Sequence, residues 1–190
     1  MAEAPDKQNP HLDNILKKVV GDFDKRVKAE SDISNVLLKG HLLIESLLLE
    51  VLAVLNVNEV RRITRLSFHE KVKCLDDQRQ SEDLKDSSII KQTIHELAPA
   101  LFALNDVRNN LSHRIDFQVT ESDVDRIGVN SGSAFILQKY ESGHSRVREN
   151  LLFCLNRIEE RLGLIIFIRV EYLKKNQNNS KPDKKKGAVK

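Results

Sequence analysis

Apolar residues recur at alternating intervals of three and four along most of the chain, which is the period of an α-helix. The clearest stripe lies between residues 88 and 114 and consists of Ile90, Ile94, Leu97, Leu101, Leu104 and Leu111. The chain has 40% hydrophobic residues, no Trp, seven Gly and only four Pro, a composition typical of a helical protein. The pattern therefore predicts an all-α protein with a buried core.

Five helices are expected, over residues 12–27, 31–55, 68–78, 88–114 and 146–173, and we expect them to form an antiparallel helical bundle. The second begins with Ser31 or Asp32 as its N-cap and is apolar around nearly its whole circumference. Other helices or a second protomer must therefore cover it on more than one side. Pro99 should bend the fourth helix without ending it, because the apolar stripe stays in phase on both sides. In the last helix, the side chains expected to face the core are Val147, Leu151, Cys154, Ile158, Leu162 and Ile165.

Residues 1–173 are expected to form one domain, followed by a basic disordered tail over residues 174–190. The tail holds seven Lys and one Asp, so residues 1–173 carry a net charge of −3 although the whole chain carries +3. The tail either attracts RNA weakly or only aids solubility. Residues 115–143 lose the helical period and are expected to form a long irregular insertion, with a short helix at 121–127, a turn at 130–133 and an alternating pattern at 134–140. Because the insertion leaves directly from His113, it should overhang that residue.

Cys74 and Cys154 lack C-x-x-C spacing and follow no secretory signal, which predicts buried thiols in a reducing cytoplasm. The most apolar runs contain too many charges for a bilayer span, so a soluble protein with no membrane partner is expected. Cys, His and carboxylate residues show no metal-site spacing and no glycine-rich phosphate loop is present, so neither a metal nor a cofactor is expected.

Arg108 occupies the place in the apolar stripe where a leucine would be expected. A guanidinium in such a place costs free energy unless it is paired, extends outward or meets an anion. Three polar side chains lie four apart on the neighbouring face: Asn105, Asn109 and His113. A purely structural interpretation is that Arg108 pairs with Asp106 or Glu45, Asn109 caps a turn and His113 interacts with the helix dipole.

Other histidines carry weaker signals. His41 and Glu45 lie four apart on the second helix, and they either support a site at Arg108 or form a simple intrahelical pair. His69 and Lys73 have the same spacing and favour the same simple interpretation. His95 and His144 stand alone in the sequence.

Residues 39–48, 66–75 and 104–113, in this order and spacing, resemble the HEPN superfamily. The signature of this all-helical family is an arginine, commonly followed by asparagine, with a histidine four to six residues further on. Arg108, Asn109 and His113 match it in full. The resemblance implies a homodimer in which the signature helices face each other and form one composite site.

The activity that the resemblance implies is metal-independent endoribonuclease activity, often that of a toxin or an antiphage-defence effector with an antitoxin or defence-system partner. His113 would act as general base or acid and Arg108 would stabilise charge on the phosphoryl oxygens, while Asn109 would orient the phosphate or the imidazole. The RNA product would carry a 2′,3′-cyclic phosphate. Four residues are expected to support these three: Glu45, His41, Asn105 and Ser112.

The alternative is a non-catalytic dimer of the same fold that acts as an RNA or nucleotide sensor, adaptor or regulator. One departure from the family concerns control. In the branch that is paired with a nucleotidyltransferase, a tyrosine that accepts the modification follows the histidine by two residues, and this chain has Ile115 there. Control by adenylylation at that position is therefore not expected.

Overall fold

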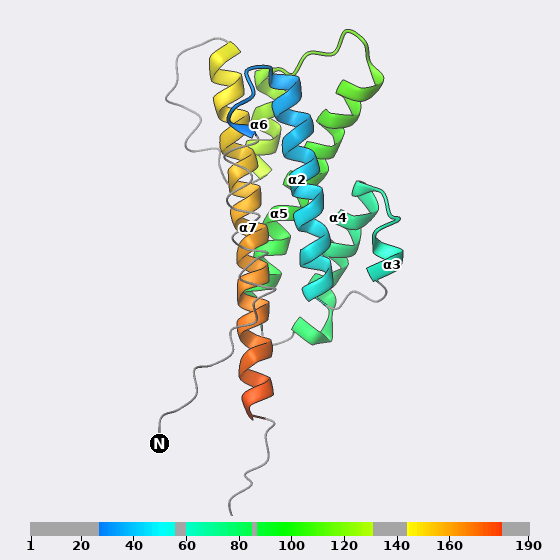
Figure 1. Cartoon of the computed structure of the whole chain (residues 1–190), viewed down its shortest axis with the longest axis vertical. Helices are drawn as coiled ribbons and strands as arrows, with labels where there is room; N and C mark the ends of the chain where they lie inside the picture. Colours follow the sequence, from blue (N-terminus) through cyan, green and yellow to red (C-terminus); the bar gives the residue numbers. More distant parts are fainter. Residues whose placement is uncertain (1–26, 56–59, 85–86, 131–143, 180–190) are drawn as a thin grey trace, which may run out of the picture.

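The computed structural model describes residues 27–55, 60–84, 87–130 and 144–179, and within these ranges all regular elements are helical (Figure 1). They are α2 (Ile33–Val54), α3 (Val60–Ile63), α4 (Phe68–Asp77), α5 (Ser88–His113), α6 (Glu121–Asn130) and α7 (His144–Asn179), with 3-10 turns at Gln78–Gln80 and Glu82–Leu84. The predicted all-α bundle is confirmed. Of the helix expected over residues 12–27, only Val27 lies in the described part of the chain, and it is buried.

Helix α2 begins as the sequence predicts, because Asp32 is its N-cap and accepts a hydrogen bond from the Asn35 backbone nitrogen at 2.8 Å. It packs against α7, α4 and α5, which covers most of its apolar circumference. At Gly40 the helix lies so close to α7 that an added Cβ would be 2.5 Å from Cδ1 of Leu155. The absence of a side chain at position 40 therefore allows α2 and α7 to lie side by side (Figure 1).

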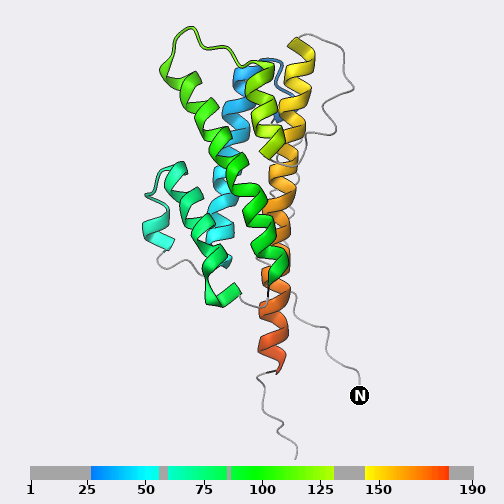
Figure 2. The ribbon, with the colours of Figure 1, turned by 180° about the vertical axis from the view of Figure 1, so that it is seen from behind.

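Helix α5 runs without a break through Pro99 from Ser88 to His113, as predicted. Its stripe is buried from Ile90 to Leu104, and Leu111 is half-buried. All six residues expected to face inward on α7 are buried. Helix α7 continues to Asn179 and extends past the other helices, so residues 174–179 of the expected disordered tail are helical (Figures 1 and 2). Residues 180–190 lie outside the described part.

The insertion expected over residues 115–143 contains a longer helix than the sequence predicted. Helix α6 runs to Asn130 and buries Val124 and Ile127, and it packs against α5 and α7. Residues 114–120 turn the chain so that α6 runs back beside α5 (Figure 2). This part of the insertion belongs to the bundle and leaves His113 exposed, so the expected overhang is wrong for residues 115–130. The remainder, residues 131–143, lies outside the described part.

Helix α4 is anchored at its first turn by a capping box. The backbone nitrogen of Ser67 donates to Oε2 of Glu70 at 2.8 Å, and the Glu70 nitrogen donates to Oγ of Ser67 at 3.3 Å. Because this cap fixes where the helix begins, Phe68, Lys71 and Val72 are buried against α2 and α5.

The two cysteines differ. Cys154 is buried, and burial raises the pKa of its thiol to about 12. Cys74 is only half-buried, at the edge of the core, so the prediction of a buried thiol is wrong there. Within the described ranges, no helix combines the length and apolar character needed to span a bilayer.

Candidate functional site

Arg108 lies where the buried stripe of α5 ends, and its side chain is half-buried. Its Nη1 donates a hydrogen bond to Oδ1 of Asn109 at 3.0 Å. No carboxylate within the described part of the chain forms an ion pair with it. The guanidinium therefore has one neutral amide as its partner and retains donors for an anion.

The two carboxylates of the purely structural interpretation are engaged elsewhere. Glu45 accepts a hydrogen bond from Nζ of Lys71, a lysine whose side chain is only 5% exposed. Asp106 lies on another side of α5, with Oδ2 4.0 Å from Nη2 of Arg126. The pairing of Arg108 with either residue is therefore wrong.

His41 on α2, one of the four residues expected to support the site, is a buried polar residue. It is 3% exposed, and its ring lies over Phe68 with the centroids 4.2 Å apart and the planes tilted by 39°. Its Nε2 has no hydrogen-bond partner among the described residues, and Glu45 bonds to Lys71 and not to His41, so the intrahelical pair is not formed. Burial lowers the pKa of His41 from 6.5 to about 4, and the charge of Arg108 acts in the same direction. The charge of Arg108 on α5 thus reaches His41 on α2 and affects its pKa.

His113 lies in the last turn of α5 and is exposed. It is five residues from Arg108, so at about 100° per residue the two side chains point about 140° apart around the helix axis. Asn105 is buried, Asn109 is half-buried and Ser112 is exposed. One protomer therefore presents the signature side chains on a broad edge of α5 and does not bring Arg108 and His113 into contact.

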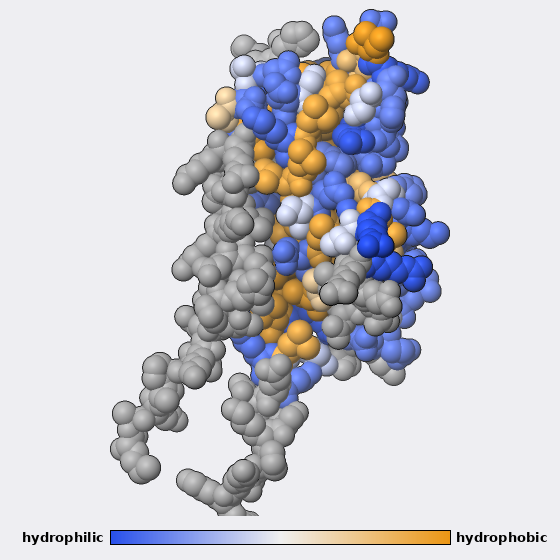
Figure 3. Space-filling view, turned by 45° about the vertical axis from the view of Figure 1, so that its right-hand side comes forward, coloured by the Kyte–Doolittle hydropathy of each residue, from blue (hydrophilic) through white to orange (hydrophobic). Residues whose placement is uncertain are grey.

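Apolar side chains lie exposed on α2, the helix that carries His41. Leu38 is 37% exposed and Leu42 is 63% exposed. Figure 3 shows the face that carries α2 and α4, where hydrophobic side chains form a broken band between polar ones. Ile115, just after α5, is fully exposed. Other large apolar side chains are exposed at the start of α5 and on α7: Ile89, Leu164, Phe167, Tyr172 and Leu173.

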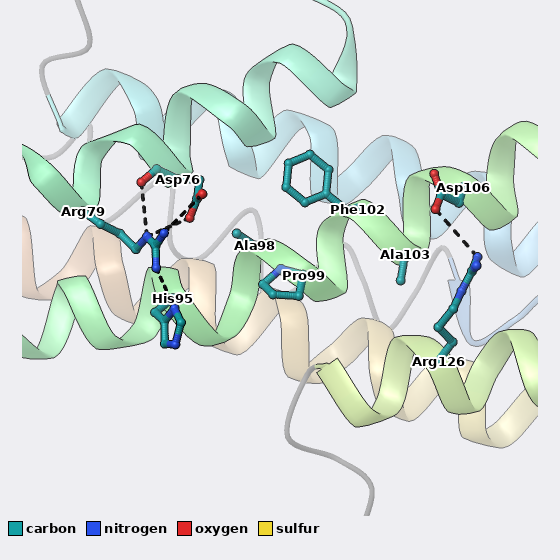
Figure 4. Close-up of a pocket in the computed structure, with 9 residues that line it drawn as sticks. All are labelled: Asp76, Arg79, His95, Ala98, Pro99, Phe102, Ala103, Asp106 and Arg126. Atoms are coloured by element: carbon teal, nitrogen blue, oxygen red, sulfur yellow. Dashed lines mark hydrogen bonds and ion pairs between the residues drawn. The ribbon is translucent and has the colours of Figure 1, made fainter.

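A second candidate is a pocket of about 470 Å³ between α4, α5 and α6 (Figure 4). Its floor is formed by Ala98, Pro99, Phe102 and Ala103. Arg79 closes one end, with Nε 2.8 Å from Oδ1 of Asp76 and Nη1 2.6 Å from Nδ1 of His95. The sequence suggested that His95 stands alone, but in the structure it lies beside Arg79.

The two arginines of this pocket, Arg79 and Arg126, each have an aspartate beside them. An anion in the pocket would have to compete with a carboxylate at either end. Arg108 has no such competitor among the described residues, so the edge of α5 at Arg108 and His113 is the stronger candidate for an anionic substrate.

Sequence reasoning missed Phe68 and Lys71 as neighbours of the site. The signal that would have found them is the Ser67-x-x-Glu70 capping box, which sets the first turn of α4 and hence its buried face. No known protein family, curated protein or solved structure matches this chain.

Proposed function

We propose that the chain is a metal-independent endoribonuclease of the HEPN kind. The observation that carries the proposal is the half-buried Arg108, which has no carboxylate partner among the described residues and lies on the same helix as the exposed His113. An arginine in this state offers a fork of donors to the oxygens of a phosphodiester, where charge develops during cleavage. The imidazole of a histidine can both take and give a proton, which suits the transfer of the 2′-hydroxyl proton.

In this mechanism His113 takes the proton from the ribose 2′-hydroxyl, whose oxygen attacks the adjacent phosphorus. The bond from phosphorus to the 5′-oxygen breaks, and that oxygen takes a proton from a second imidazole. Arg108 stabilises the charge on the non-bridging oxygens, and Asn109 holds the guanidinium in place. The products are a 2′,3′-cyclic phosphate and a 5′-hydroxyl.

The second imidazole is supplied by a second copy of the chain. Arg108 and His113 diverge on one helix, so a facing α5 from another protomer is needed to surround a phosphodiester with both kinds of group. The exposed Leu38 and Leu42 of α2, the helix that carries His41, offer apolar surface to an interface. A homodimer with a composite site accounts for both features.

The dimer is tested by Leu42→Lys, which places a charge on the proposed interface. Its matched control is Phe167→Lys, because Phe167 is 53% exposed on α7. Light scattering should give half the mass for Leu42→Lys alone, and that variant should lose RNA cleavage while its circular dichroism is unchanged. A monomeric wild-type protein, or equal effects of the two variants, would contradict the composite site.

The catalytic residues are tested by incubating single-stranded RNA with excess EDTA and with each variant. His113→Ala and Arg108→Ala should each slow cutting by at least about a hundredfold. The matched controls are His95→Ala, which removes a histidine from the same face of α5, and Arg126→Ala, which removes an arginine beside α5. Undiminished cutting of RNA by either test variant would contradict the mechanism.

An enzyme that cuts cellular RNA needs restraint, so we propose that the protein is a toxin or antiphage effector with an antitoxin or defence-system partner. Expression should then arrest growth for the wild type and not for His113→Ala. The second candidate function, a non-catalytic RNA or nucleotide sensor, is favoured by one observation: no hydrogen bond orients the exposed His113 within the described part of the chain. RNA binding without cutting would support that alternative.

A further inference from the structure

The pocket between α4, α5 and α6 has the size of a small-molecule site (Figure 4). Its volume of about 470 Å³ lies within the range of about 300–1,000 Å³ that is typical of ligand pockets. Three of the residues that line it, His95, Pro99 and Asp106, are exposed to solvent, so a ligand reaches the pocket without any movement of the helices. Arg108 and His113 do not line the pocket, so a ligand there leaves the proposed cleavage site open.

The middle of the pocket is apolar. Pro99 and Phe102 line it from α5, and Figure 4 shows them between the two polar ends. The ring of Phe102 packs against His69 of α4, with the ring centroids 5.0 Å apart and the planes tilted by 50°. The neighbouring Ala98 and Ala103 have small side chains and leave room above the floor. A surface of this kind suits a ligand with a flat ring system.

The charges at the two ends of the pocket cancel. Asp76 and Arg79 lie at one end, and Asp106 and Arg126 lie at the other. A negatively charged ligand would meet a carboxylate at both ends, and a positively charged ligand would meet a guanidinium at both ends. An uncharged ligand that carries hydrogen-bonding groups at both ends avoids either repulsion.

The end at Asp106 and Arg126 has the donors and acceptors that recognise guanine. Oδ2 of Asp106 lies 4.0 Å from Nη2 of Arg126, which is too long for a hydrogen bond, and the two side chains are 59% and 47% exposed. A carboxylate has two acceptor oxygens, whereas a guanidinium only donates. Guanine presents two adjacent donors, N1–H and the 2-amino group, next to the acceptor O6. The carboxylate therefore matches the two donors, and the guanidinium matches the acceptor.

The other end suits the hydroxyl groups of a ribose. Nη1 of Arg79 lies 2.6 Å from Nδ1 of His95, and because a guanidinium only donates, Nδ1 accepts and the ring hydrogen is on Nε2. This end thus combines an N–H donor of His95 with the acceptor oxygens of Asp76, and a hydroxyl group both donates and accepts. His95 and Asp106 are eleven residues apart on α5, about 16 Å along the helix axis, which leaves a base and its sugar room between the two ends.

We propose that this pocket binds free guanosine. The base stacks on Phe102, donates from N1 and from its 2-amino group to Asp106, and accepts at O6 from Arg126. The ribose lies at the end that holds Asp76 and His95. A free nucleoside fits better than a guanosine phosphate or a guanine in an RNA strand, because phosphate groups on the ribose would lie close to the carboxylate of Asp76.

Isothermal titration calorimetry of the full chain with guanosine, inosine and adenosine tests the recognition of the base. Guanosine should bind at least about tenfold more tightly than inosine, which lacks the 2-amino donor. Adenosine should bind more weakly than guanosine by at least the same factor, because it has an acceptor where guanine has N1–H. Equal binding of the three nucleosides, or no binding of guanosine tighter than about 1 mM, would overturn the proposal.

Two substitutions separate the polar contacts from the stacking. Asp106→Asn keeps the size of an exposed side chain and removes one acceptor, so it should weaken guanosine binding by at least about tenfold and abolish the preference over inosine. Its matched control is Asp125→Asn, which changes an exposed carboxylate of α6 outside the pocket and should bind guanosine as the wild type does. Phe102→Leu should weaken all three nucleosides alike, by about threefold or more. Unchanged guanosine binding by Asp106→Asn would refute the assignment.

The RNA trinucleotide UGU distinguishes a free nucleoside from a base in a strand. It is titrated into His113→Ala, which is not expected to cut it, and it should bind more weakly than guanosine. Tighter binding of UGU than of guanosine would overturn the assignment of a free nucleoside. Guanosine binding by a protein that cuts no RNA would contradict the ribonuclease and leave this proposal supported.

Discussion

The buried imidazole of His41 should make the stability of the fold depend on pH between 7 and 5. In the unfolded chain this histidine has the ordinary pKa of 6.5, whereas in the folded chain the pKa is about 4. The unfolded state therefore binds a proton first as the pH falls. The contribution is complete above pH 6.5 and is lost progressively as the pH approaches 4.

The size of the effect follows from the two pKa values. The gap between 6.5 and about 4 corresponds to about 3 kcal/mol when the proton is bound only in the unfolded state. Over the interval from pH 7 to pH 5, about 2 kcal/mol of this should be lost. A loss of about 2 kcal/mol is a large fraction of the free energy of unfolding of an ordinary domain.

The assay is urea unfolding of the wild type and of His41→Phe at pH 7 and pH 5, in phosphate-free buffer and at one protein concentration. The wild type should lose about 2 kcal/mol more than the variant over this interval. The pKa values of Glu70 and Glu96 are lowered by hydrogen bonds from Ser67 and Gln92, so their contributions are lost only below about pH 4.5 and are common to both proteins. A difference between the two proteins that does not change with pH refutes the account of His41.

Residues of the helical bundle outside the candidate site give three further predictions. Gly40→Ala should lower the free energy of unfolding by about 1–3 kcal/mol, because the new Cβ overpacks against α7. Gly163→Ala should raise the free energy of unfolding by about 0.5–1 kcal/mol, because nothing lies within 4 Å of the new Cβ. Chemical denaturation of the two variants and the wild type measures both changes. Arg169→Ala should cost about 2 kcal/mol in the same assay, because the buried guanidinium donates to the backbone carbonyls of Val54 and Asp83; an unchanged unfolding midpoint contradicts this. Iodoacetamide at pH 8 should label the half-buried Cys74 well before Cys154, as peptide mass spectrometry can show, and the reverse order would be inconsistent with the structure.

The helices could be predicted because each has a strong period of its own. The bounds of α2 and α5 agree with the sequence to within about two residues, since the N-cap of α2 and the apolar stripes of both helices are local signals. Helix α7 extends beyond its apolar stripe into residues that were expected to be disordered, because exposed Lys and Asn continue a long helix at little cost. The sequence predicted that α6 ends at residue 127 instead of Asn130, because so short a helix contains few helical periods.

The site could be predicted only in part. Arg108, Asn109 and His113 lie on one helix, so their spacing shows in the sequence. The contact of His41 with Phe68 and the pairing of Lys71 with Glu45 join different helices, and no local pattern encodes them. The absence of a carboxylate at Arg108, within the described ranges, likewise depends on where the neighbouring helices place Glu45 and Asp106.

If His113 and Arg108 cleave RNA through its own 2′-hydroxyl, the ends of the products carry the record of that chemistry. Single-stranded RNA incubated with the wild type in excess EDTA should give 2′,3′-cyclic phosphate and 5′-hydroxyl ends. DNA of the same sequence, and RNA incubated with His113→Ala, should remain uncut. Products with 3′-hydroxyl and 5′-phosphate ends, or cutting of the DNA, would contradict the account.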